Sequence, residues 1–127
     1  MYDRTRKNKA LMRRVYDEMW NQEKPALAGE LFARPEGVER FVSGFLVSFP
    51  DLQHSVEAMI AEGDQVAVRF SAQGTHLGQW LGFAPTGRAI RYTGVTLARI
   101  ADDKIVEHHT WWDKAALIEQ LEGRAEL

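Results

Sequence analysis

Two β-rich runs near the C-terminus, separated by a four-residue turn, constrain the fold of this chain more than any other feature. The runs read IRYTGVTLARI and IVEHHTWWD, and the turn between them reads ADDK at residues 101–104. Paired aspartates between two runs of this kind predict a β-hairpin. The segment KAALIEQL, which follows the second run, predicts a short closing helix.

The turn also predicts how the two strands pair. If Asp102 and Asp103 are its central residues, Ile100 lies opposite Ile105. The same register pairs Ala98 with Glu107, Thr96 with His109, Gly94 with Trp111 and Tyr92 with Asp113. A slip of one residue would exchange the two faces of the strand, because side chains alternate along it.

The expected alternation divides the hairpin into a mixed face and an apolar face. The mixed face carries Tyr92, Gly94, Thr96, Ala98, Glu107, His109, Trp111 and Asp113. The apolar face carries Val95, Leu97, Arg99, Val106, His108, Thr110 and Trp112. Small residues facing larger polar and aromatic ones are typical of a concave, partly polar cavity, so the mixed face predicts a pocket lining.

Apolar residues at helical spacing fill the first half of the chain. They predict helices over Thr5–Asn21 and Gly37–Phe49, and a short helix over Pro25–Ala33 that begins with its proline. Tyr16 and Phe45 lie on the apolar sides of the long helices. Tyr16 is expected either as a core residue with a satisfied hydroxyl or as a residue that points its hydroxyl into a cavity.

Two further strands are expected between these helices and the hairpin. They cover Leu52–Glu62 and Gln65–His76. The Gly- and Pro-containing segment Gly74–Gly87 is expected as a loop or a frayed strand edge, with Trp80, Leu81 and Phe83 as candidate lid residues. Helices followed by antiparallel strands indicate an α+β fold. We expect one domain over residues 1–127, with a curved antiparallel sheet of four to five strands that forms an open cone with three N-terminal helices around one pocket.

Composition restricts the function classes. The chain has 127 residues, no cysteine, and a formal net charge of -2, so thiolate catalysis and thiolate metal sites are excluded. No apolar run of about 18 residues is present, and the basic N-terminus lacks a signal core. We therefore expect a cytoplasmic protein with neither a membrane nor a nucleic acid as its partner.

The chain resembles the SnoaL-like polyketide cyclases of the nuclear-transport-factor-2-like (NTF2-like) superfamily. The matching segments are NKALMRRVYDEMWNQ, FPDL, EGDQVAVRFSAQGTHLGQWLG, TGRAIRYTGVTLARIADDKIVEHHTWWD and KAALIEQL. They cover most of the chain in the family's order. The sequence departs from the family at His109, where a tryptophan is common, and at residues 31–37, which are too short for the usual insert.

The resemblance implies a cofactor-free aldol cyclisation, in which an acidic residue ahead of the last helix moves a proton. Asp113 matches that position, and His109 is the second catalytic candidate. Tyr92, expected about 5 Å from Asp113, is a candidate hydrogen-bond donor. His109 lies about 13 Å along the strand from Asp113 and would contact the other end of a ring-sized substrate.

Other interpretations of Asp113 and of the function of the domain stay open. Asp113 could serve only as a helix N-cap, a role worth roughly 1 kcal/mol, and the domain could then be a non-catalytic binding protein for a small hydrophobic molecule. The remaining candidate pocket residues are Trp111, Trp80, Thr96, Tyr16, His54 and Phe45.

No metal site is expected, since the four histidines lack metal-binding spacings. The family resemblance also implies a homodimer through the apolar sheet face, where Val95, Leu97, Val106 and Trp112 could supply the apolar contact.

Overall fold

The computed structural model describes residues 2–124, and all its helices except the closing one precede its strands, as the sequence predicts. The elements are α1 (Tyr2–Arg14), a π-helical segment η1 (Val15–Trp20), a 3-10 helix η2 (Pro25–Leu27), α2 (Ala28–Leu31), α3 (Glu36–Ser48), β1 (Gln53–Glu62), β2 (Gln65–Thr75), β3 (Ala89–Ala101), β4 (Lys104–Trp112) and α4 (Lys114–Leu121). No helix within residues 2–124 is long and apolar enough to cross a membrane.

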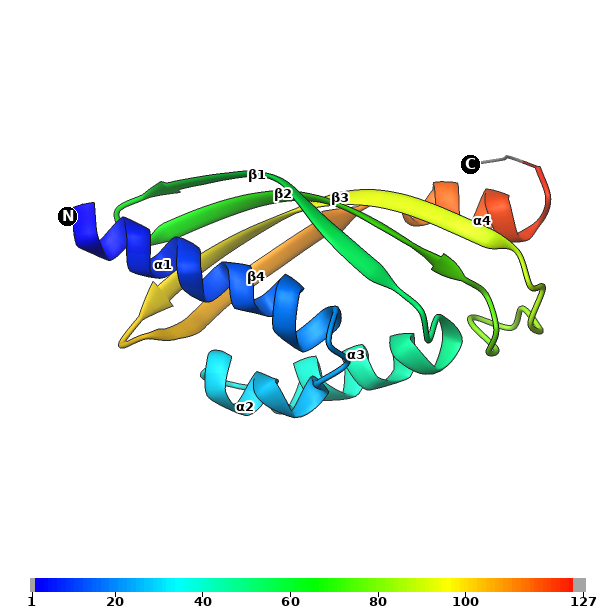
Figure 1. Cartoon of the computed structure of the whole chain (residues 1–127), viewed down its shortest axis with the longest axis horizontal. Coiled ribbons are helices and arrows are strands. Elements are labelled where there is room, and N and C mark those ends of the chain that lie inside the picture. The colour runs from blue at the N-terminus through cyan, green and yellow to red at the C-terminus, as the bar shows by residue number, and fades with distance from the viewer. Residues whose placement is uncertain (1, 125–127) are drawn as a thin grey trace.

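The four strands form one antiparallel sheet in the order β1-β2-β3-β4. The sheet curves, and α1, α2 and α3 lie together on its concave side, whereas α4 packs at one end (Figure 1). This arrangement confirms the expected α+β cone. The hydrophobic core lies between the helices and the concave face.

Alternation along β2 explains why the sheet presents one apolar face to the helices. Val66, Val68, Phe70 and Ala72 are buried, as their spacing predicts. Burial of such side chains on one face fixes the register of a strand, because a slip of one residue would move all of them into solvent.

The β3–β4 hairpin has the predicted turn but a different register beyond it. Asp102 and Asp103 have φ of 51° and 60°, which suits a tight hairpin turn, and Ile100 pairs with Ile105 as expected. The next pair is Arg99 with Glu107, so β4 carries one extra residue, Val106, in a β-bulge.

The bulge makes the predicted faces of β4 wrong. Thr96 pairs with Thr110 and not with His109, and Gly94 pairs with Trp112 and not with Trp111. His108, Thr110 and Trp112 therefore turn toward the helices, and the expected opposition of Tyr92 and Asp113 is lost, because one inserted residue inverts the alternation of every residue after it.

Gly94 gives the concave face room for aromatic rings. A Cβ placed there would lie 2.6 Å from Cζ of Phe70 and 2.9 Å from Cβ of Trp112. Only glycine avoids these contacts, so its small size lets two rings pack over the centre of β3.

The first helix differs from a continuous α-helix in its last turn. Helical periodicity predicts one element over Thr5–Asn21, but residues from Val15 onward are π-helical, with the amide of Asn21 donating to the carbonyl of Tyr16 at 3.0 Å. π-helical turns are rare and occur often at functional sites. This turn places Tyr16, Met19 and Trp20 in the core.

Candidate functional site

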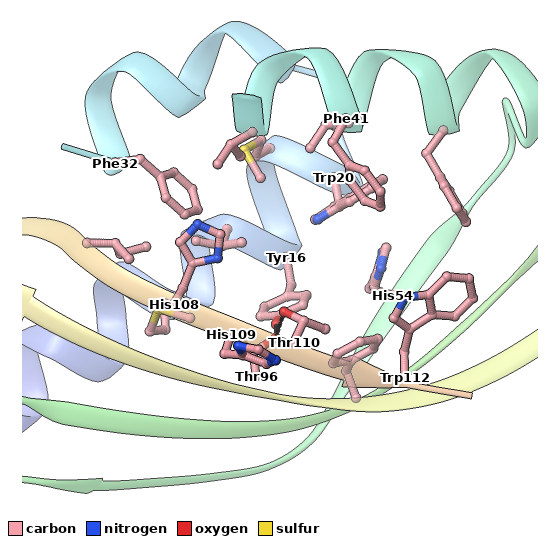
Figure 2. Close-up of a pocket in the computed structure, with 18 of the residues that line it drawn as sticks. Tyr16, Trp20, Phe32, Phe41, His54, Thr96, His108, His109, Thr110 and Trp112 are labelled. Atoms are coloured by element: carbon pink, nitrogen blue, oxygen red, sulfur yellow. Dashed lines mark hydrogen bonds between the residues drawn. The ribbon is translucent and has the colours of Figure 1, made fainter. Parts of the chain in front are cut away.

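A pocket of about 620 Å³ lies between the concave face of the sheet and the helices. This volume suits a drug-sized molecule. Its lining is mainly aromatic and aliphatic, and the aromatic members are Tyr16, Trp20, Phe32, Phe41, Phe45, Phe70, Tyr92 and Trp112. Figure 2 shows these walls, with the helices above and the strands below.

His54 is the buried titratable base of the pocket. It comes from β1, is 7% exposed, and its ring centroid lies 4.8 Å from that of Trp20, 5.6 Å from Tyr16 and 5.5 Å from Phe70. Its Nδ1 atom is buried and has no hydrogen-bond partner among the described residues. Burial lowers the pKa of His54 to about 4, so the imidazole is neutral at pH 7.

Tyr92 lies near His54 on the neighbouring part of the wall. The two ring centroids are 6.5 Å apart, and Tyr92 is 6% exposed. Within residues 2–124, the Tyr92 hydroxyl forms no hydrogen bond. Burial, together with the nearby Tyr16, raises the pKa of Tyr92 well above its ordinary value, so this hydroxyl is a neutral donor.

Three hydroxyls form a chain across the pocket floor. Tyr16 donates to Oγ1 of Thr96 at 2.8 Å, and Thr96 Oγ1 lies 2.8 Å from Oγ1 of Thr110. Burial raises the pKa of Tyr16 to about 12, and the hydrogen bond to Thr96 opposes part of that rise. The chain fixes the position of Tyr16 and leaves Thr110 at the open side of the site.

Asp113 does not open into this pocket, contrary to the expected inward orientation. Its Oδ1 accepts a hydrogen bond from the amide of Ala116 at 3.0 Å, its side chain caps α4, and the residue is exposed. The bulge and the end of β4 turn it outward. The N-cap interpretation of Asp113 is therefore confirmed, and its catalytic role stays a prediction.

No carboxylate lines the pocket within the described part of the chain. The titratable residues in the lining are Tyr16, Tyr92, His54, His108, His109 and Arg34. Burial and the neighbouring charge of His109 lower the pKa of His108.

The remaining predicted site residues divide between the pocket and other places. Thr96, Phe45 and His109 belong to the lining, although the His109 ring stacks on Trp111 with centroids 4.2 Å apart. Trp111 is 55% exposed on the convex face, so its predicted place in the pocket wall is wrong. Trp80 lies behind the wall, where it packs against Phe45 and Trp112.

Sequence reasoning missed several lining residues that the fold brings together. The register expected from the turn puts His108, Thr110 and Trp112 on the opposite face, because no sequence signal marks the bulge. Arg34 and Phe32 reach the pocket because the segment after α2 pairs with β4: the amide of Ala33 donates to the carbonyl of Ile105 at 2.9 Å.

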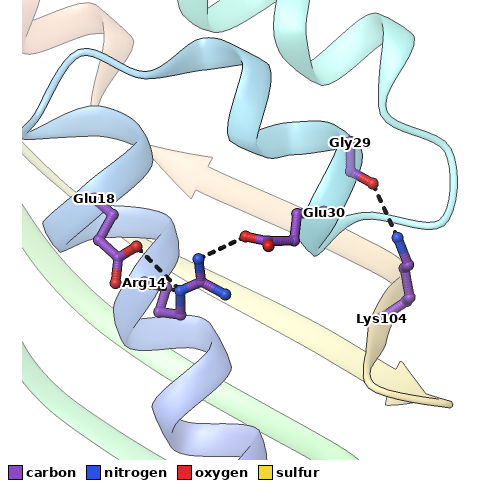
Figure 3. A network of polar contacts seen from close by, with 5 residues as sticks. All are labelled: Arg14, Glu18, Gly29, Glu30 and Lys104. Carbon is purple, nitrogen blue, oxygen red and sulfur yellow. Dashed lines mark hydrogen bonds and ion pairs between the residues drawn. The ribbon is translucent and has the colours of Figure 1, made fainter.

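Polar contacts attach the helical wall to the hairpin (Figure 3). Arg14 Nη2 donates to Glu30 at 2.6 Å and its Nε donates to Glu18 at 3.1 Å. Lys104 Nζ donates to the carbonyl of Gly29 at 2.9 Å. These contacts join α1, α2 and the hairpin turn at one end of the pocket.

Metal ligands are not gathered at this site. Across residues 2–124, no group of three or more His, Cys, Asp or Glu side chains is placed to hold a metal ion.

The sequence profile of the SnoaL-like polyketide cyclases matches residues 10–121. The chain belongs to this family. The match includes both the pocket wall of η1 and α3 and the β3–β4 hairpin. Among curated proteins, none matches the chain significantly.

Solved structures share the fold of this SnoaL-like chain. AclR, a proposed hydroxylase from Streptomyces galilaeus, is 26% identical with a TM-score of 0.87, over 97% of this chain and 85% of AclR. IdmH, a proposed polyketide cyclase from Streptomyces antibioticus, is 28% identical with a TM-score of 0.77, over 91% of this chain and 98% of IdmH.

A proposed SnoaL-like polyketide cyclase from Jannaschia is 24% identical with a TM-score of 0.84, over 97% of this chain and 95% of that one. These likenesses establish the NTF2-like cone. The same cone accompanies different proposed activities, so chemistry has to be argued from the pocket.

Proposed function

We propose that this SnoaL-like protein is a cyclase- or isomerase-type enzyme that moves a proton on a hydrophobic, ring-containing small molecule in the pocket. The family and the aromatic lining support the type of substrate. The observation that carries the proposal is the pairing of His54 with Tyr92. His54 is a neutral imidazole whose buried Nδ1 has no hydrogen-bond partner among the described residues. Its ring centroid lies 6.5 Å from that of Tyr92.

The two residues would divide the acid–base work. A ring nitrogen of His54 takes a proton from an acidic carbon next to a carbonyl group, and the electrons of the broken C–H bond form an enolate. The Tyr92 hydroxyl donates a hydrogen bond to the enolate oxygen, where the negative charge develops. In an intramolecular aldol closure, the enolate carbon then attacks a second carbonyl of the same molecule, and the imidazolium returns the proton to the new alkoxide.

A second candidate function is binding of the same kind of molecule without chemistry. It is favoured by the absence of carboxylates from the described pocket lining and by the low pKa of His54, which makes its imidazole a weak base. Both functions use the same pocket, but only the enzyme converts the bound molecule, so one experiment that measures binding and conversion can separate them.

Deuterium exchange into 2-tetralone, a bicyclic ketone with acidic protons beside its carbonyl, tests the proposal. The wild-type protein should accelerate exchange in D₂O, followed by proton NMR. His54→Gln should reduce the acceleration about a hundredfold, and Tyr92→Phe should also reduce it. The rate should stay level from about pH 8 to about pH 5, because His54 remains neutral over that range.

Asp113→Asn is the matched control, since asparagine keeps the helix cap and removes the carboxylate. Exchange that survives Asp113→Asn and is lost in His54→Gln supports His54 as the base. The opposite pattern would restore the sequence-based assignment of Asp113, and loss in a His109→Gln variant would restore that of His109. Saturable binding of 2-tetralone without exchange would favour the binding function.

We also propose that the convex face of the sheet pairs with a second copy of the chain. Val95 and Leu97 are each 39% exposed there, beside the exposed Trp111. Trp111 takes the place of Trp112 in the expected contact, since Trp112 lies in the pocket. Apolar side chains gathered on one face of a sheet are typical of a self-complementary interface.

A further inference from the structure

The mouth of the pocket differs in charge from its interior. Arg34 lies between α2 and α3, is exposed, and contributes to the lining. The backbone fixes its place, because Phe32 and Ala33 pair with Ile105 at the edge strand β4. His108 follows on the same strand and its ring packs edge-on against Phe32, with centroids 5.1 Å apart.

The charge of Arg34 is not neutralised by an acidic partner. None of the ion pairs within residues 2–124 involves Arg34, although other arginines, Arg14 and Arg99, have glutamate partners. The described lining also holds no carboxylate, even though the whole chain has a formal net charge of -2. A cation beside an apolar cavity without an anion favours a negatively charged ligand group.

The interior has the opposite character. His54 and Tyr92 are held neutral by burial, and aromatic rings surround them. Moving an ionised group into such a place is costly, so an acidic group of the ligand would stay at the mouth.

We infer that the pocket takes an amphipathic anion, with its ring system inside and a carboxylate or similar acidic group at the mouth held by Arg34. This inference rests on the proposed function, because it names the class of molecule for the same pocket. Arg34 presents a planar, permanently charged guanidinium that fits a carboxylate with two hydrogen bonds. His108, which also lines the pocket and packs against Phe32, two residues before Arg34, can donate one more.

Two fluorescent probes that differ in one acidic group test the inference. They are 1-anilinonaphthalene-8-sulfonate and the uncharged N-phenyl-1-naphthylamine. Wild-type protein should bind the sulfonate more tightly, and Arg34→Gln should weaken sulfonate binding about fivefold while leaving the uncharged probe unchanged. Added salt should weaken only the sulfonate, because screening acts on charge.

Arg40→Gln is the matched control, since Arg40 is exposed on α3 outside the pocket lining. It should change neither affinity. Val38→Trp, which places a large ring at the pocket wall, should weaken both probes and so locate them in the pocket. Circular dichroism checks that each variant is folded.

The outcomes separate this inference from the proposed function. Equal affinities for the two probes, or equal losses for both in Arg34→Gln, would overturn the anion preference while the pocket still binds. Binding of neither probe, or binding of both that Val38→Trp does not weaken, would overturn ligand binding in this pocket and the inference with it.

Discussion

The two faces of the β3–β4 hairpin come from the same short segment and differ in almost every physical property. On the concave face, Thr96 and Trp112 join a buried network of hydroxyls and rings. On the convex face, Trp111 is 55% exposed, and its ring lies close to that of His109, with centroids 4.2 Å apart. The comparison teaches that residue type alone does not identify a site. Burial changes the pKa and the hydrogen bonding of a side chain, and alternation along the strand decides which side chains are buried.

The largest expected effect concerns the buried histidine of the concave side. Burial lowers the pKa of His54 to about 4, whereas an unfolded histidine titrates near its ordinary value. Below that ordinary value the unfolded chain takes up a proton that the folded chain excludes, so the free energy of unfolding falls as the pH drops. The loss due to His54 reaches about 3 kcal/mol near pH 4 and levels off below that pH, where the folded chain also takes up the proton.

His54→Phe should remove this part of the pH dependence, because phenylalanine fills the same aromatic surroundings without titrating. Urea unfolding at about pH 7 and about pH 4.5 measures the difference. Equal pH dependence in His54→Phe and the wild type would contradict the description of His54 as a buried neutral imidazole.

An intermediate effect is expected from the two adjacent tryptophans. Trp112 contacts the rings of Phe45, Trp80 and Tyr92, so Trp112→Ala should lower the free energy of unfolding by about 2 kcal/mol. Trp111→Ala should change the stability of the monomer by less than about 0.5 kcal/mol. It should instead shift the mass measured by analytical ultracentrifugation from dimer toward monomer.

The contrast between the two faces of the hairpin would be wrong if Trp111→Ala lowered the stability strongly and Trp112→Ala did not. A large loss of monomer stability in Trp111→Ala would mean that the register beyond the bulge is the one expected from the turn. A wild-type protein that is monomeric at all concentrations would overturn the proposed dimer and leave the contrast in stability intact.

The smallest effect is expected at the end of β4. Asp113 accepts the Ala116 amide, so Asp113→Ala should lower the free energy of unfolding by about 1 kcal/mol, whereas Asp113→Asn should cost only a fraction of that. Urea unfolding of the two variants measures both. A loss of several kcal/mol in both variants would indicate contacts of Asp113 beyond the cap.

Periodicity was sufficient for most of the fold. Alternating Val66, Val68 and Phe70 identified the buried face of β2, and the spacing of apolar residues located the long helices. Local turn chemistry was also sufficient, because Asp102 and Asp103 tolerate positive φ and so fixed the hairpin turn. These features depend on residues close in sequence, which is why the sequence reveals them.

Other parts of the candidate site depend on contacts between residues far apart in the sequence, which no local pattern encodes. The bulge at Val106 reverses the faces of β4, and the π-helical turn at Tyr16 reorients the end of the first helix. The bulge brings His108, Thr110 and Trp112 to the pocket, and the π-helical segment contains the buried Tyr16, Met19 and Trp20.

By itself, the sequence determined the family, the order of helices and strands, the hairpin turn and the cap of the last helix, because each rests on local propensity or on one strand's alternation. Only the tertiary structure decided that His54 and Tyr92 share a dry chamber, that Asp113 faces outward and that Arg34 stands at the mouth. Burial and juxtaposition are properties of the packed chain, since they join residues far apart in sequence, and one inserted residue in a strand is enough to change them.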